Sequence, residues 1–167
     1  MTRCAALLAP VALLASLAGC GLQPMYAGGG SGAVAQGLAA VDVAPIEGQA
    51  GWLVRNALRD RLAQSGASAE PRYRLDVLLD DELEGLGLLT DETIGRERRT
   101  LRARYQLVDL ASGEIVIDAS AGSDAGVDVV SSEFATIAAE ERALENLAVA
   151  VADRIVTQVT LALRSGR

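Results

Sequence analysis

The chain has 167 residues, half of which are hydrophobic, and it carries 22 acidic residues, 15 basic residues, no His and a formal net charge of −7. This acidic balance excludes bulk binding to nucleic acid or to anionic lipid surfaces, because both attract cationic proteins. The absence of His excludes zinc sites and nucleophile pairs that require an imidazole, and no metal or cofactor is indicated.

The N-terminal segment has the parts of an export signal: a cationic start, an apolar core and small residues before Cys20. The core is short and contains Pro10, so it does not form a stable membrane span. The tetrapeptide Leu-Ala-Gly-Cys that ends at Cys20 resembles the lipobox of bacterial lipoproteins, in which the cysteine is lipidated after cleavage. We therefore expect a lipoprotein signal peptide over residues 1–19 and a lipid anchor on Cys20. The alternatives are a plain secretory signal that contains a cysteine and a buried thiol in a folded domain.

The next segment, residues 20–37, is rich in glycine and other small residues, which predicts a flexible tether. A single domain is expected over residues 38–167. Its first stretch, residues 38–46, is apolar and partly alternating, which predicts a strand. From Trp52 onward, apolar residues recur at helical spacing opposite arginines and glutamine, which predicts an amphipathic helix that Gly66 ends.

Three alternating patterns follow, at residues 72–80, 100–110 and 114–122. Alternation of apolar with charged or polar residues is typical of strands that are wet on one side only. In the third pattern Ile115 and Ile117 are expected on the same apolar face. The charged segment 84–99 between the first two strands predicts a long hairpin connection with frayed strand ends.

The last helix is predicted from Phe134 to Leu163, where apolar residues recur at steps of three and four after a capping serine. The element order is therefore β-α-β-β-β-α, which predicts an α+β fold. We expect a four-stranded mixed sheet, in which the first two strands are parallel and the others form an antiparallel meander. Both helices are expected to pack on the one apolar face of this sheet.

This order of elements behind a lipobox resembles the LPS-assembly lipoprotein family LptE, in its alphaproteobacterial form. The mature start CGLQPMYA, the first-helix segment RNALRDRL and the strand segments YRLDVLL and RARYQLVDLASGEIV are similar to that family. The segment SSEFATIAAEERALENLAVAVADRI resembles the family's last helix. The resemblance covers essentially the whole chain after the signal peptide and rests on order and spacing.

The resemblance implies a non-enzymatic lipoprotein of the cell outer membrane, anchored on its periplasmic side, that plugs and helps assemble a β-barrel lipopolysaccharide translocon. Expected partners are the barrel subunit, lipopolysaccharide and, through the lipid, the membrane. Gly21 stands where an Asp would retain enteric lipoproteins in the inner membrane, so outer-membrane sorting is expected. The alternatives are an auxiliary binding lipoprotein of an ABC-type envelope lipid transport system and a hydrolase that uses carboxylates.

Arginines follow the polar side of the predicted strands, at Arg72, Arg74, Arg98, Arg102 and Arg104. Guanidinium groups form bidentate, charge-assisted bonds with phosphates and carboxylates, which suits the phosphates and acidic sugars of lipopolysaccharide. These five residues are therefore the candidate lipopolysaccharide-binding site. The alternative is a solvated ladder of arginines and cross-strand acids, which stabilises a sheet without any ligand.

Overall fold

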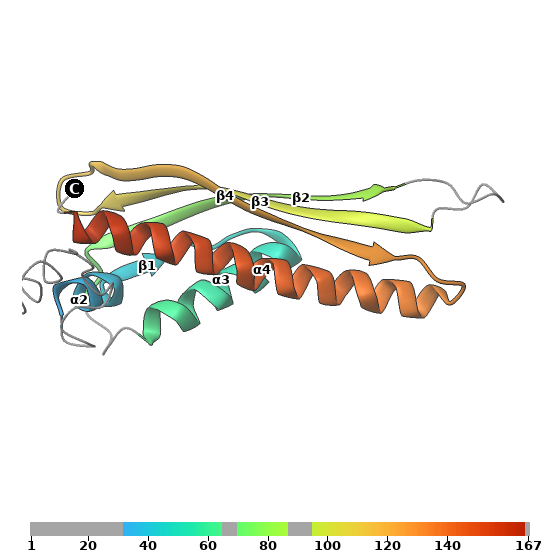
Figure 1. Ribbon diagram of the computed structural model, residues 1–167. Coiled ribbons are helices and arrows are strands. Elements are labelled where there is room, and N and C mark those ends of the chain that lie inside the picture. Colours follow the sequence, from blue (N-terminus) through green and yellow to red (C-terminus); the bar gives the residue numbers. More distant parts are fainter. Residues whose placement is uncertain (1–31, 65–69, 87–94, 166–167) are drawn as a thin grey trace, which may run out of the picture.

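The computed structural model describes residues 32–64, 70–86 and 95–165. Its elements, in chain order, are α2 (Ala33–Ala39), β1 (Val41–Val43), α3 (Gly48–Ala63), β2 (Tyr73–Gly85), β3 (Arg96–Asp109), β4 (Ile115–Asp128) and α4 (Glu133–Arg164). The α+β class is confirmed (Figure 1). The expected signal peptide, Cys20 and the helix-ending Gly66 lie outside the described residues.

The sheet has the order β1-β2-β3-β4, with β1 parallel to β2 and the other neighbours antiparallel, as predicted. β2 continues to Gly85 and β3 begins at Arg96, so ordered pairing extends into the segment expected to hold frayed ends. The alternation of buried and exposed positions stops in the last part of β2, where residues 80–85 are all exposed, so the order there comes from pairing with residues 97–102 of β3. The sheet is therefore an elongated ribbon.

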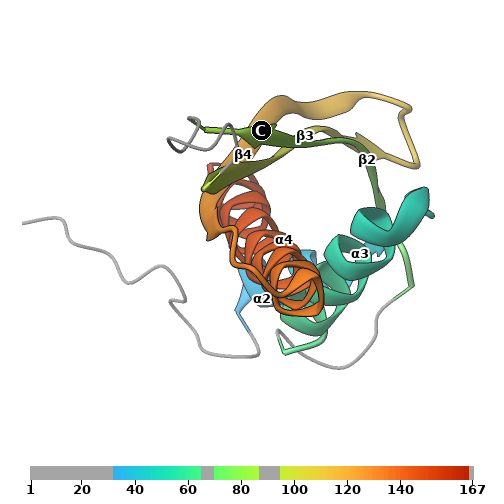
Figure 2. The ribbon, with the colours of Figure 1, turned by 90° about the vertical axis from the view of Figure 1, so that its right-hand side faces the viewer.

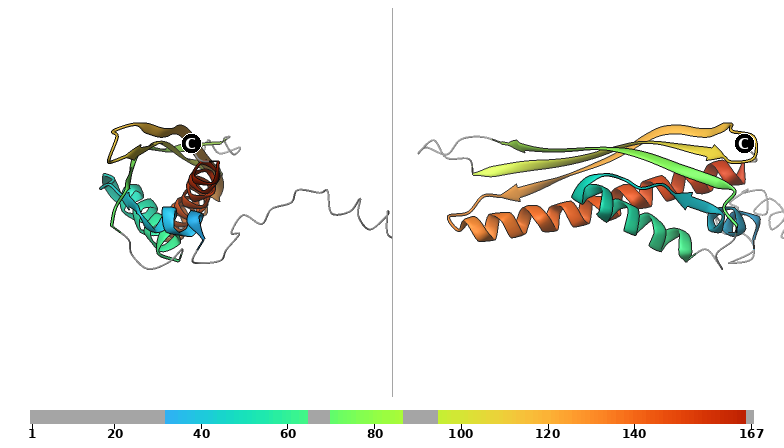
Figure 3. Two further views of the ribbon diagram at one scale, coloured as in Figure 1. Left: turned by 90° about the vertical axis from the view of Figure 1, so that its left-hand side faces the viewer. Right: turned by 180° about the vertical axis from the view of Figure 1, so that it is seen from behind.

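All described helices lie on one side of the sheet, with α3 and α4 side by side beneath it (Figure 2). The views from the other end and from behind show that none of them covers the outer face (Figure 3). The core joins Leu75, Tyr105 and Leu107 of the sheet to Leu58 of α3 and Val151 of α4. α4 is the one described helix with the length and hydropathy of a membrane span, and its apolar residues supply much of this core.

The N-terminal part of the domain differs from the prediction. Residues 33–37, expected in a tether, belong to α2, and the strand expected over residues 38–46 is reduced to the three residues of β1. Packing explains the extra helix, because Leu38 is fully buried and a Cβ on Gly37 would lie only 3.2 Å from Cδ1 of Leu163 in α4. Such a contact depends on residues far apart in the chain, so local periodicity did not reveal it.

The start of α3 is also earlier than predicted, at Gly48 rather than near Trp52. Gly48 adopts a φ of 78°, which favours glycine. Gly51 lies against the chain that enters the helix, since a Cβ there would come within 2.6 Å of the carbonyl oxygen of Ile46. These glycines are required by the turn, although their low helix propensity argues against a helix in the sequence.

A β-bulge in β4 places Ile115 on the opposite face of the sheet from the one predicted. Leu107 lies opposite Ile117, but Val108 lies opposite Ile115, so Val116 is an extra residue in the ladder. Val116 packs against the core, whereas Ile115 is 50% exposed. The prediction that Ile115 and Ile117 share one face is therefore wrong, because the bulge changes the phase of the alternation.

Candidate functional site

The structure places four of the five predicted arginines along the outer side of the sheet: Arg74, Arg98, Arg102 and Arg104. The fifth, Arg72, directly precedes β2 and lies at the end of the sheet beside α2. All five are exposed, as the alternation predicts. They are spread along the length of the strands, however. Arg74 lies opposite Val108 near one end of the sheet. Arg98 lies opposite Glu84 near the other end. The row is therefore not one cluster, and Arg102 and Arg104 occupy its middle.

Arg102 and Arg104 border a depression of about 380 Å³ on the outer face, together with residues of β2 and β4. Its other lining residues include Leu78, Asp80, Ser120 and Gly122. The strand register sets Arg104 opposite Leu78 and Arg102 opposite Asp80. Gly122 leaves room for the depression because it presents no side chain beside Arg102, whose Cγ lies 3.4 Å from where a Cβ of Gly122 would be.

Arg104 is held by Asp118 of β4, which it contacts through Nη2 at 3.2 Å and Nε at 3.4 Å. Asp118 also accepts a hydrogen bond from Nε2 of Gln106 at 2.9 Å. The hydrogen bonds from Gln106 and then Arg104 lower the pKa of the Asp118 carboxyl. Arg102 makes no hydrogen bond or ion pair with any described residue. The two cations therefore differ, since Arg104 belongs to a charge ladder and Arg102 has no polar partner in the part of the chain that the structure describes.

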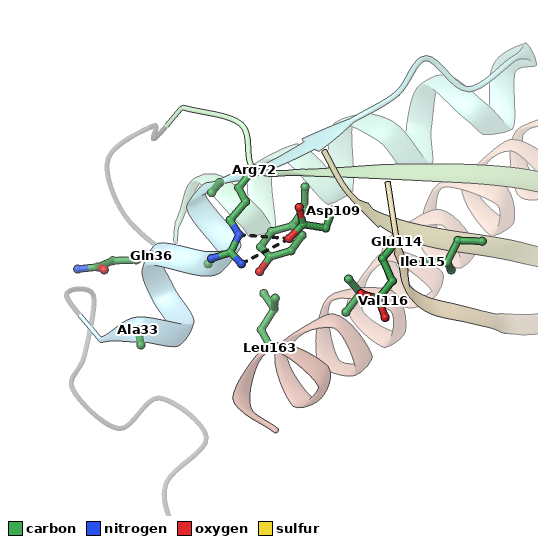
Figure 4. A pocket seen from close by; sticks show the side chains of 11 residues that line it. Ala33, Gln36, Arg72, Asp109, Glu114, Ile115, Val116 and Leu163 are labelled. Atoms are coloured by element: carbon green, nitrogen blue, oxygen red, sulfur yellow. Dashed lines mark hydrogen bonds and ion pairs between the residues drawn. The ribbon is translucent and has the colours of Figure 1, made fainter. Parts of the chain in front are cut away.

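Arg72 lies at the end of the molecule where α2 and the C-terminus of α4 meet the sheet (Figure 4). It borders a cavity of about 900 Å³, also lined by Tyr73, Asp109, Glu114 and Leu163. Both Nε and Nη2 of Arg72 contact Asp109 Oδ2 at 3.4 Å, and its guanidinium lies 5.0 Å from the centre of the Tyr73 ring. Arg72 therefore belongs to a different hollow from Arg102 and Arg104.

The two remaining arginines have contrasting surroundings. Arg74 donates to both carboxylate oxygens of Asp76 on its own strand, at 3.0 Å. Arg98 makes no hydrogen bond or ion pair within the described part of the chain, although Glu84 lies opposite it. The predicted ladder of charges is thus present at Arg104 and incomplete at Arg98 and Arg102.

Leu78 was not identified from the sequence as a residue of the candidate site. Leu78 is 75% exposed and lies on the wet face, directly opposite Arg104. The alternation could have shown this position, since Leu78 lies on the same side of the strand as Asp76 and Asp80. An exposed leucine beside two arginines makes the depression amphipathic. Among the described residues, no group of three or more acidic or thiol side chains is placed to hold a metal ion.

The sequence model of the lipopolysaccharide-assembly family LptE matches residues 38–159, which include every described strand and most of α4. The chain belongs to the LptE family. This confirms the family that the order of elements and the short segments resemble. No sequence among the curated proteins compared matches the chain significantly.

Solved structures share the LptE fold of this chain at low sequence identity. A proposed lipoprotein from Caulobacter crescentus is 23% identical with a TM-score of 0.67, and the match covers 81% of this chain and 98% of that one. The rare lipoprotein B of Shewanella oneidensis is 13% identical with a TM-score of 0.57, covering 76% and 96%. An uncharacterised lipoprotein B of Nitrosomonas europaea is 15% identical with a TM-score of 0.57, covering 75% and 86%.

Proposed function

We propose that this LptE-family protein is a non-enzymatic subunit of a lipopolysaccharide translocon, and that it plugs and helps assemble the β-barrel partner in the outer membrane. The observation that carries the proposal is the family match over residues 38–159. The shape is compatible with it, because α4 alone, with 32 residues, is about 48 Å long at 1.5 Å per residue. An elongated two-layer domain of this kind suits the interior of a wide barrel.

The test of this role is affinity purification of the lipidated protein from its own membranes. The barrel subunit is expected to co-purify, and depletion of the lipoprotein is expected to lower the amount of assembled barrel and of surface lipopolysaccharide. A purification that yields the lipoprotein without any barrel, and components of an ABC-type transporter instead, would contradict the proposal. A barrel whose amount is independent of the lipoprotein would contradict the assembly role.

The proposed location is the periplasmic side of the outer membrane, with Cys20 as the anchor. The export-signal pattern before Cys20 and the residue Gly21 after it support this location. Several acyl chains on one cysteine hold a protein on a membrane far more stably than a single chain. Replacement of Cys20 by Ala is expected to abolish incorporation of labelled palmitate and to leave the protein in the soluble periplasmic fraction. Continued labelling of the variant would exclude Cys20 as the anchor.

We further propose that the outer face of the sheet contacts lipopolysaccharide at the depression between Arg102 and Arg104. The guanidinium groups supply donors for phosphate, and the exposed Leu78 supplies an apolar contact beside them. Arg102 supports this assignment most directly, because its charge has no acidic partner among the described residues. Arg74 and Arg98 would extend the contact along the sheet, toward its opposite ends.

A further inference from the structure

The outer edge of β4 is unpaired in the structure. β4 is 14 residues long and has β3 as its one neighbour in the sheet. Within the described part of the chain, no backbone hydrogen bond joins its other edge to a further element. A long strand edge of this kind presents a row of free N–H and C=O groups, which is a template for another strand.

The second long free edge of the sheet is different. β1 pairs only with residues 73–75, so most of β2 also has an open edge. That part of β2 carries Asp80, Asp81, Glu82 and Glu84, and a run of charge is one of the devices that prevent strand addition. The middle of β4, residues 119–123, has neither charge nor proline. The edge of β4 is therefore the one left open to pairing.

A groove follows this open edge on the side of the helices. It has a volume of about 420 Å³ and lies between Ser120, Ala121 and Gly122 of β4 and Asp153, Arg154, Thr157 and Gln158 of α4. Figure 2 shows β4 at the margin of the sheet beside α4. In strand addition, every second side chain of the added strand enters such a groove, while the backbone supplies the affinity.

The helix wall of the groove is held in place by its own contacts. Gln158 accepts a hydrogen bond from the hydroxyl of Tyr105 at 2.7 Å, and Asp153 accepts one from Arg61 of α3. Arg154 makes no hydrogen bond or ion pair with any described residue. The groove thus offers fixed polar groups and one available cation, which suits polar or acidic side chains of an incoming strand.

The opposite side of the edge carries acidic residues. Asp118, Asp124 and Asp128 lie on the outer face of β4, and Asp124 lies opposite Thr100 with no ion-pair partner among the described residues. A basic residue on an added strand would therefore find a free carboxylate. A second copy of β4 would bring like charges together in a chain of net charge −7. Charge complementarity therefore selects a different, basic chain.

We infer that β4 accepts an extended segment of another polypeptide as a fifth strand of the sheet. The residues of that segment alternate between polar side chains that enter the groove beside α4 and Lys or Arg side chains that meet Asp124 on the outer face. The observations that carry this inference are the open edge, the groove and the charges, so it stands apart from the proposed translocon role.

The probe for this site is a fluorescent peptide of about nine residues, long enough for a strand, in which Thr and Arg alternate. The control peptide has the same composition with all Arg residues at one end. Binding to the full-length protein is measured by anisotropy, and amide hydrogen exchange of the protein is followed with and without the probe. The alternating peptide is expected to bind about tenfold more tightly than the control, and to slow exchange in residues 119–124 but not in β2.

Variants of the edge supply the second arm. Ala121→Pro and Gly122→Pro are both made, because only one of these two neighbours directs its N–H away from β3. The variant that keeps the wild-type melting temperature is expected to bind the alternating peptide about tenfold more weakly, as expected for the loss of one or two backbone hydrogen bonds. Equal binding of the two peptides, absence of binding at about millimolar peptide, undiminished binding by the folded variant, or a homodimer that protects β4 would each overturn the inference.

Discussion

Arg99 and Asp81 form a two-pronged ion pair across β2 and β3, with Nε to Oδ1 at 2.9 Å and Nη2 to Oδ2 at 2.7 Å. The pair lies on the inner face of the sheet, on a diagonal, since Asp81 is opposite Leu101. Nη1 of Arg99 also donates to the backbone oxygen of Glu140 in α4 at 3.1 Å. Arg99 therefore connects both strands to α4, in the part of the sheet that α3 does not reach (Figure 1).

This ion pair is expected to contribute measurably to stability. The side chains of Arg99 and Asp81 are only 16% and 25% exposed, so removal of the carboxylate leaves a largely buried cation without its partner. Asp81→Ala is expected to lower the free energy of unfolding by about 1 to 3 kcal/mol, less than the loss for a fully buried pair. Urea unfolding followed by circular dichroism measures the difference.

The matched control is Asp76→Ala on the same strand. Asp76 pairs with Arg74, and these side chains are 41% and 48% exposed, so the loss is expected to stay below about 1 kcal/mol. A loss at Asp76 as large as that at Asp81 would show that the change of β propensity, and not the ion pair, sets the effect.

The second prediction concerns the buried face of α4. Leu147 and Val151 are 3% and 0% exposed and pack in the core. Leu147→Asp or Val151→Asp is expected to unfold the domain, because an unpaired charge would enter an apolar layer. Val149→Asp is the control, since Val149 lies on the same helix and is 41% exposed. Unchanged melting temperatures and circular dichroism in the core variants would mean that α4 does not pack on the sheet.

The third prediction follows from the lowered pKa of Asp118. Because the folded carboxyl holds its proton less tightly than the unfolded one, the stabilisation is complete above the ordinary Asp pKa of about 3.9 and is lost as the pH falls through the folded pKa. Asp118→Asn is therefore expected to melt below the wild type at neutral pH, with the two melting curves converging in acid. Melting temperatures that stay parallel down to acidic pH would show that protonation of Asp118 does not affect stability.

Much of the fold was predictable because it depends on local periodicity. The alternation in β2 and β3 predicted that Arg74, Arg102 and Arg104 face outward, and the burial of Tyr105 and Leu107 confirms that phase. The sheet order also followed from the element order. A resemblance of short segments predicted the family, which the match over residues 38–159 confirms.

The remaining features depend on contacts between distant residues. α2 is held by packing such as that of Gly37 on Leu163, and the bulge at Val116 comes from its pairing with β3. Arg99 and Asp81 look like ordinary surface charges in the sequence, although alternation places them on the same face of their strands as the apolar residues. In the same way, the spread of the five arginines became apparent only from the strand register, which alternation alone does not define.

The fourth prediction tests the depression on the outer face. If Arg102 and Arg104 bind phosphorylated lipid, Arg102→Gln with Arg104→Gln is expected to weaken lipopolysaccharide binding by about tenfold or more, because each charge-assisted contact contributes about 1.5 to 3 kcal/mol. The fold is expected to survive, since both side chains are exposed. Binding of lipopolysaccharide to the purified protein is measured at moderate salt, where screening weakens nonspecific attraction.

The charge ladder predicts a different result for the same double variant. Loss of the contact between Arg104 and Asp118 would then lower the melting temperature slightly, because the pair is exposed to solvent, and leave ligand binding unchanged. The control removes equal charge elsewhere, with Arg59→Gln and Arg142→Gln, two exposed positions on α3 and α4. Arg55 is a poorer control because its Nε donates to the backbone oxygen of Val43 at 3.3 Å. Equal affinity losses in both double variants would assign the effect to net charge and exclude a specific site at Arg102 and Arg104.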